Sequence, residues 1–184
     1  MNTATEKKIT DWDIDAVHST FEFAVRHMKV STVKGAFSGV SGEIHFDPDD
    51  VADSSVRVEI DMNTVDSHNA GRDDTLRGER FFEVEKYPTA TFVSKQVRPN
   101  ADGSFQVIGD LTMRGVTNEV AFNTIFEGLQ MTPADIYRGA FTAHATIQRT
   151  DFGFSEGTPL PGGGFSLSND VELAMFSSVK PKEE

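Results

Sequence analysis

Residues 14–46, IDAVHSTFEFAVRHMKVSTVKGAFSGVSGEIHF, decide the fold. Apolar and other residues alternate in the first half, so Phe21, Phe23 and Val25 share one side of a strand. A short polar connection at residues 29–32 predicts a turn, and a second strand follows it. Glycines inside that second strand are typical of sharp bends, which a sheet needs in order to close on itself. The stretch predicts two long strands, each with one apolar face, and indicates a barrel.

The rest of the chain supplies strands of the same kind that can cover the dry faces. Period-two alternation recurs over residues 55–62, 89–98, 105–113, 120–126, 137–147 and 171–179. With the first two strands this makes about eight, several of them long enough to be tilted in an antiparallel barrel. We therefore expect an all-β fold, an eight-stranded antiparallel barrel in a single domain spanning residues 1–184. Residues 1–10 are expected to form a flexible N-terminal segment.

Two segments depart from the strand pattern. A polar stretch before Phe81 and Phe82 predicts one short helix near residues 69–78. The double phenylalanine suggests a plug that seats this helix against a cavity or a barrel end. Residues 151–166, DFGFSEGTPLPGGGFS, are rich in glycine and proline and predict a mobile flap beside a mouth.

Composition excludes several classes of function. The 184 residues carry a net charge of -12, which argues against a nucleic-acid partner, since such proteins need basic patches. The chain has no cysteine, so it has no thiol nucleophile and no zinc site built on thiolates. It shows no signal-peptide pattern and no run of ~20 apolar residues that would form a transmembrane segment. We therefore expect a cytoplasmic protein.

Candidate chemistry is sparse. His18 and His27 lie nine residues apart and face opposite sides of a regular strand, so they do not share a metal ion. Each is either a hydrogen-bonded structural residue or a contact to a ligand head group. Arg72 and Arg77 either form a helix cap and surface ion pairs or meet a polar head group at a tunnel mouth. No nucleophile elbow and no metal-ligand spacing occurs, so we expect no catalytic residue, no metal and no enzymatic activity.

Ordered motifs along the chain resemble one family. The first set is Asp15, His18, Ser19, Phe21, Phe23, His27, Gly35, Phe37 and Gly42. The second is Arg72, Asp73, Leu76, Phe81, Phe82, Tyr87, Pro88 and Phe92, followed by residues 109–117, GDLTMRGVT, and by Arg149 with Asp151, Phe152 and Gly153. Over roughly residues 12–179 the chain resembles the YceI-like family. One departure is Thr75, where members commonly have a histidine.

The resemblance implies a lipocalin-like barrel whose internal hydrophobic tunnel holds a polyisoprenoid chain. The expected tunnel wall is Phe21, Phe23, Val25, Phe37, Phe82, Phe92, Leu111, Phe122, Phe141 and Phe152. The expected head-group residues are His18, His27, Arg72 and Arg77. The expected partner is a long-chain isoprenoid lipid, either an isoprenoid quinone or a polyprenyl phosphate, that the protein binds, stores or transports without a required cofactor.

Two alternatives stay open at this point. One is a quinone-linked redox or electron-transfer accessory protein, and the other is a stress-related binder of small amphipathic compounds. The sequence also leaves open a transient membrane contact and a homodimer.

Overall fold

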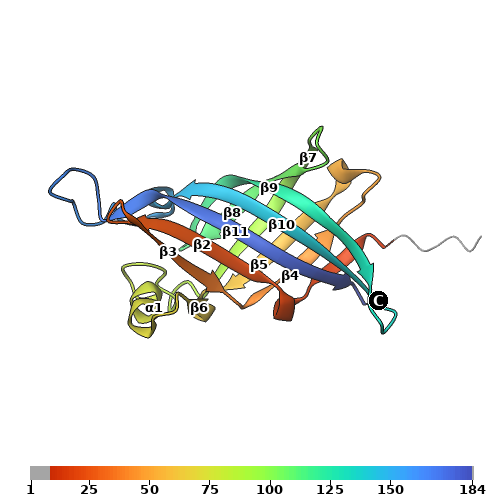
Figure 1. The fold of residues 1–184 in the computed structure, drawn as a ribbon, viewed down its shortest axis with the longest axis horizontal. Coiled ribbons are helices and arrows are strands. Elements are labelled where there is room, and N and C mark those ends of the chain that lie inside the picture. The colour runs from red at the N-terminus through yellow and green to blue at the C-terminus, as the bar shows by residue number, and fades with distance from the viewer. Residues whose placement is uncertain (1–8, 184) are drawn as a thin grey trace, which may run out of the picture.

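The fold is an antiparallel β-barrel with one α-helix, seen in a computed structural model that describes residues 9–183 (Figure 1). Most of the expected flexible segment 1–10 therefore lies outside the described residues. The strands are β1 (Asp11–Ile14), β2 (Thr20–His27), β3 (Ser31–Phe37), β4 (Val40–His45), β5 (Ser55–Asp61), β6 (Val65–Asp66), β7 (Thr89–Pro99), β8 (Phe105–Met113), β9 (Val116–Met131), β10 (Tyr137–Gln148) and β11 (Leu167–Pro181). The helices are α1 (Ala70–Arg77) and the 3-10 turns η1 (Ala16–His18), η2 (Val51–Asp53), η3 (Met62–Thr64) and η4 (Arg149–Phe152).

All strands belong to one sheet in the order β1-β4-β5-β7-β8-β9-β10-β11-β2-β3-β6, and pairing of β1 with β11 closes it. The long strand β11 pairs with β2 along its first part and with β1 at its end. β1 and β2, which are separated by η1, both pair with β11 and together occupy one strand position of the barrel. β3 and β4 together occupy the next position. The barrel therefore has eight strand positions, as the sequence predicted, and the two-residue β6 is added at an edge.

Residues 14–46 fold in more pieces than the two predicted strands. The first is interrupted by η1, and the second divides at Ser38–Gly39 into β3 and β4. These two halves have different partners, since β3 pairs with β2 and β6 while β4 pairs with β1 and β5. A Cβ atom at Gly39 would lie 2.8 Å from the Cβ of Asp61, so the chain passes there too closely for a side chain.

The predicted helix is confirmed as α1. The Asn69 side chain accepts a hydrogen bond from the Arg72 amide at 2.9 Å, and Gly78 follows the last turn. In Figure 1 α1 and β6 lie together beside one end of the barrel. Within residues 9–183, no helix has the length and apolar character needed to cross a membrane.

The barrel interior is filled by a continuous apolar core that the alternation of the strands produces. Phenylalanine rings gather at two places in it. Toward one end Phe46, Phe126 and Phe141 contact one another with centroids 4.8–5.1 Å apart. Toward the α1 end Phe37 lies between Phe23 and Phe82, at 5.8 and 5.5 Å.

Candidate functional site

Two apolar chambers lie inside the barrel. Chamber 1, of about 80 Å³, includes Phe46, Phe105 and Phe141 in its lining. Chamber 2, of about 90 Å³, lies toward α1 and includes Phe23, Phe37 and Phe82. Both are therefore built from the inward faces of strands that are distant in sequence.

The two chambers share a constriction formed by Phe21, Ile60 and Leu111, which line both of them. These side chains are 9%, 2% and 3% exposed. They come from β2, β5 and β8, on different parts of the barrel wall. These three side chains therefore lie between the two chambers.

The structure places nine of the ten expected wall residues at the chambers. They are Phe21, Phe23, Val25, Phe37, Phe82, Phe92, Leu111, Phe122 and Phe141. The tenth, Phe152, lines neither chamber. It lies in η4 with 1% of its surface exposed, because the chain has left the period-two pattern of β10 at that point.

Phe82 lines chamber 2 next to Leu76 of α1. Its ring contacts Phe23, Phe37 and Phe154 with centroids 5.5–6.2 Å apart, in edge-to-face arrangements. Beneath it the Phe23 ring lies directly over Gly35, where a Cβ atom would be 2.4 Å from the Phe23 Cζ atom. The plug expected from the double phenylalanine is therefore seated between α1 and the barrel.

Arg149 is a polar residue of chamber 2, which the sequence analysis named in a family motif but did not assign to the tunnel. It is 7% exposed, and its guanidinium donates to main-chain oxygens of Ser155, Glu156, Leu167 and Ser168. Burial lowers the pKa of Arg149, and the charge of Glu156 opposes this shift. No carboxylate forms an ion pair with it among the described residues.

The signal for Arg149 was present in the sequence. The inward positions of β10 are odd-numbered, from Phe141 to Ile147, and position 149 continues the series. An arginine at an inward position is rare unless its donors are satisfied, and here main-chain oxygens satisfy them.

Chamber 1 has polar groups in its wall, and the main chain already satisfies the buried ones. The Thr124 hydroxyl donates to the Phe122 carbonyl at 3.2 Å, and the Ser177 hydroxyl donates to the Phe141 carbonyl at 3.3 Å. His45 lies at the wall as well, with its Nδ1 atom 2.9 Å from Asp11. The hydrogen bond with His45 lowers the pKa of Asp11. The chamber therefore presents a nearly nonpolar surface.

The two expected head-group histidines line neither chamber. His18 lies in η1 with its side chain 68% exposed, and its Nδ1 atom is 2.9 Å from Asp15. That hydrogen bond lowers the pKa of Asp15. His27 ends β2 and pairs across the sheet with Leu167, which does line chamber 2.

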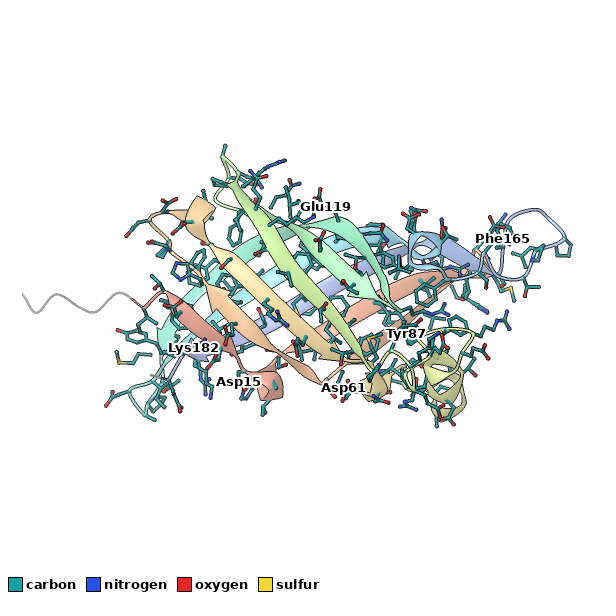
Figure 2. All side chains as sticks on the ribbon, turned by 180° about the vertical axis from the view of Figure 1, so that it is seen from behind. Asp15, Asp61, Tyr87, Glu119, Phe165 and Lys182 are labelled. Atoms are coloured by element: carbon teal, nitrogen blue, oxygen red, sulfur yellow. The ribbon has the colours of Figure 1, made fainter. Side chains whose placement is uncertain are left out.

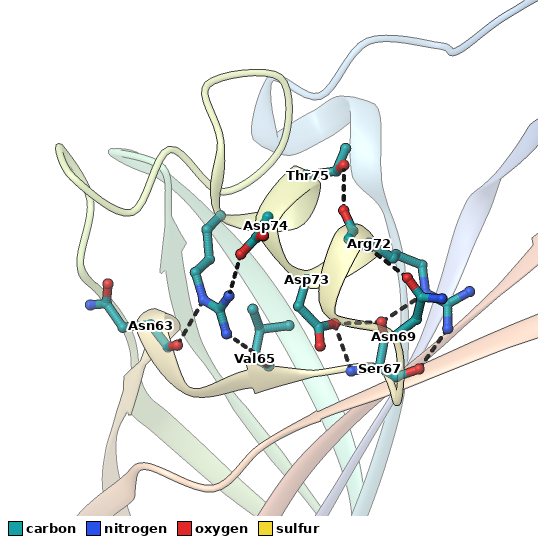
Figure 3. A network of polar contacts seen from close by, with 10 residues as sticks. Asn63, Val65, Ser67, Asn69, Arg72, Asp73, Asp74 and Thr75 are labelled. Carbon is teal, nitrogen blue, oxygen red and sulfur yellow. Dashed lines mark hydrogen bonds and ion pairs between the residues drawn. The ribbon is translucent and has the colours of Figure 1, made fainter.

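The two expected head-group arginines are both engaged in fastening α1 to the barrel (Figure 3). Arg72 donates from Nε to the Ser67 hydroxyl at 2.7 Å, and Arg77 donates to the carbonyls of Asn63 and Val65 at 3.1 and 3.0 Å. Thr75 donates to the Gly71 carbonyl within the helix. Neither arginine lines a chamber.

Asp73 completes this fastening, which we call the α1 latch: Ser67, Arg72, Asp73 and Arg77. Asp73 is 7% exposed and accepts hydrogen bonds from the amide and the hydroxyl of Ser67 at 2.8 and 2.5 Å. The hydroxyl bond of Ser67 is the main reason that the pKa of Asp73 is lowered, and burial opposes it. Among residues 9–183, no cluster of three or more histidine, aspartate or glutamate side chains could hold a metal ion.

Comparison with known proteins identifies the family. The YceI-like domain matches residues 12–176 of the chain. The chain belongs to the YceI-like family. A UPF0312 protein of Yersinia pestis (strain Pestoides F) is 38% identical over 154 residues, which is 83% of this chain and 80% of that relative.

Solved structures of YceI-like proteins share the fold. The Campylobacter jejuni YCEI protein is 28% identical, with a TM-score of 0.73 over 86% of this chain and 90% of that one. A polyisoprenoid binding domain from Saccharophagus degradans, implicated in plant cell wall breakdown, has a TM-score of 0.65. It is 17% identical, covers 95% of this chain and 100% of its own, and shows the likeness of the fold.

Proposed function

We propose that this YceI-like protein binds the tail of a long-chain isoprenoid lipid in chambers 1 and 2 and stores or carries it without converting it. The observation that carries the proposal is the pair of apolar chambers that meet at Phe21, Ile60 and Leu111. A branched hydrocarbon tail needs apolar surface and no polar partner, and the buried hydroxyls of the wall are already bonded to the main chain. The polyisoprenoid-binding description of the Saccharophagus domain, which has the same fold, supports this choice of ligand class.

The volumes indicate how the tail would be accommodated. Each chamber, at about 80–90 Å³, is smaller than the ~150 Å³ engineered cavity that admits a benzene molecule. A long tail therefore requires the constriction and the Phe82 plug to move. Each square ångström of tail and wall then removed from water contributes ~25 cal/mol, so that a long tail binds tightly with few polar contacts.

The head group of an anionic isoprenoid is best placed at chamber 2. Arg149 is a buried cation at its wall without a carboxylate partner, whereas the imidazole at the wall of chamber 1, His45, is already hydrogen-bonded to Asp11. A phosphate near Arg149 would supply the missing negative charge. The four residues predicted for this role line neither chamber, whereas Arg149 lines chamber 2, so Arg149 replaces them in the proposal.

The test is to identify what the protein carries. Native mass spectrometry of the purified protein, followed by organic extraction, should show an isoprenoid that copurifies or that can be loaded from added polyprenyl phosphate. A chain that takes up no isoprenoid under either condition would overturn the proposal.

The same samples separate the two alternatives. A redox accessory protein predicts a change in the oxidation state of a bound quinone, and a binder of small amphipathic compounds predicts that such compounds displace the isoprenoid. The carrier predicts neither, because its chambers bury a tail and hold no redox-active group on the described residues.

A further inference from the structure

One end of the barrel is formed by two loops that lie side by side beyond chamber 2. They are the β2–β3 turn, residues 28–30, and residues 157–166 of the flap, and we call them together the tip. The Met28 amide donates to the Ser166 carbonyl at 2.8 Å, and the Lys29 ammonium donates to the Gly163 carbonyl at 2.5 Å. Both loops project at the left in Figure 1, and Phe165 marks the same end in Figure 2.

The tip exposes apolar side chains. Val30 is 79% exposed and Met28 is 45% exposed, in a turn that points away from the barrel. The flap beside them carries Pro159, Leu160 and Pro161 and no charged residue from 157 to 169. An exposed apolar group of this kind marks a contact surface when its surroundings favour one partner.

The β2–β3 hairpin of the tip is cationic, although the chain as a whole has a net charge of -12. Lys29 lies in the turn, Arg26 and Lys34 lie on the two strands that it joins, and residues 23–42 contain no aspartate or glutamate. Among the described residues, no ion pair neutralises any of these three side chains. Apolar side chains flanked by cations match the surface of a bilayer with anionic lipids.

The tip lies next to chamber 2, so a membrane bound at the tip would be close to that chamber. His27, which ends β2 just before the turn, pairs with Leu167, and Leu167 and Val25 line the chamber. We propose that the tip docks on membranes rich in anionic lipid and brings chamber 2 to the bilayer from which an isoprenoid enters. Entry of an isoprenoid into chamber 2 rests on the proposed function, whereas binding of the tip to the membrane does not.

The other apolar end of the molecule lacks this charge complement. Leu129, Met131 and Ile136 at the β9–β10 turn are 44–47% exposed, but Glu127 and Asp135 lie among them in the sequence. An anionic surface would repel that end. The tip is therefore the end that fits a membrane.

The experiment is cosedimentation with vesicles that contain no isoprenoid, made of phosphatidylcholine alone or mixed with phosphatidylserine. We expect binding to the mixed vesicles only, weakened by added salt because the charges are exposed. Lys34→Gln should weaken binding about fivefold, the contribution of one cation near an anionic surface. Val30→Asp should abolish it.

Matched controls are available. Val17→Asp replaces a valine that is 84% exposed in η1, and Arg98→Gln removes a cation from the end of β7, both away from the tip. Both should bind as the wild type does. Equal binding to both kinds of vesicle, no binding to either, or an equal loss in the controls would overturn the proposal.

The outcome is independent of the test for the cargo. Val30→Asp protein should keep any isoprenoid that copurifies, because the Val30 side chain lines neither chamber. A protein that carries isoprenoid but ignores anionic vesicles refutes docking alone. One that docks but never carries isoprenoid refutes the proposed function alone.

Discussion

Phe82 lines chamber 2 beside Leu76 of α1, and it is only half-buried although it touches three other rings. Phe82→Ala should lower the free energy of unfolding by about 2–3 kcal/mol, below the ~3–5 kcal/mol of a fully buried phenylalanine. Uptake of a fluorescent isoprenoid should become faster, because the plug is gone. Urea unfolding and stopped-flow fluorescence measure the two effects.

The control for Phe82 is Phe176→Ala. Phe176 is 39% exposed and contacts the His144 ring, with centroids 5.9 Å apart. It should leave the uptake rate unchanged. Equal uptake rates in wild-type and Phe82→Ala protein would contradict the assignment of Phe82 as the plug.

Gly35 sets the position of the Phe23 ring. In Gly35→Ala the new methyl group would displace that ring, whose Cζ atom lies 2.4 Å from the Cβ position, and push it into chamber 2. We expect a loss of about 1–3 kcal/mol in unfolding free energy from overpacking, together with lower isoprenoid occupancy by native mass spectrometry.

Gly71→Ala serves as the comparison for Gly35. Gly71 lies in α1, and the nearest atom to a new Cβ there is the Asn69 Oδ1 atom, 3.6 Å away. The substitution should therefore be neutral or stabilise the protein by up to ~1 kcal/mol. If the two alanine variants had the same stability and occupancy, the close approach at Gly35 would not matter.

At the scale of elements, α1 is joined to the barrel by the α1 latch and by Leu76, its one buried apolar side chain. Asp73→Ala removes the acceptor of two Ser67 hydrogen bonds and should cost about 1–3 kcal/mol, because buried donors lose their partner. Asp74→Ala removes a surface ion pair between Asp74 and Arg77. Because the Asp74 side chain is 81% exposed, this change should cost below ~1 kcal/mol. Denaturant unfolding of both variants decides whether the latch holds the helix.

The latch also predicts a pH dependence. The folded pKa of Asp73 is lowered, so its contribution is complete above the unfolded value of ~3.9 and disappears as pH falls through the folded value. The difference in unfolding free energy between wild type and Asp73→Asn should therefore shrink as pH falls below ~4. Asp11 and Asp15 also have lowered pKa values, but they are present in both proteins and cancel in the difference. A difference that stayed constant down to acid pH would contradict the role of the carboxylate.

At the scale of the molecule, the tunnel depends on the constriction that joins the chambers. Leu111→Trp should block it, so that a short prenyl phosphate is still bound while a long polyprenyl phosphate is lost. Val93→Trp adds the same bulk at a side chain that is 41% exposed on β7 and should leave both ligands bound. Native mass spectrometry with the two ligands measures this. Unimpaired binding of the long ligand to Leu111→Trp would show that the tail does not cross the constriction.

Local patterns predicted what depends on local geometry. Strand alternation together with the family resemblance predicted the wall, and eight of the nine wall residues found at the chambers lie in strands, Phe82 being the exception. Asn69 and Gly78 predicted the ends of α1. The division at Gly39 was not predictable, because it depends on which distant strands pair with β3 and β4. Arg149 was named only as part of a family motif and was not assigned to the tunnel, although parity pointed inward.

Arg149 grips the flap by the main-chain oxygens of Ser155 and Glu156, and those contacts do not depend on which side chains the flap carries. The amino-acid sequence of the flap can therefore change while its contacts with Arg149 are kept. A binding peptide spliced between Gly162 and Gly163, where a Cβ would meet nothing within 4 Å, would be displayed at the far end of the barrel. By such changes in the flap, the same barrel can bind new partners while its interior stays unaltered, in evolution as in engineering.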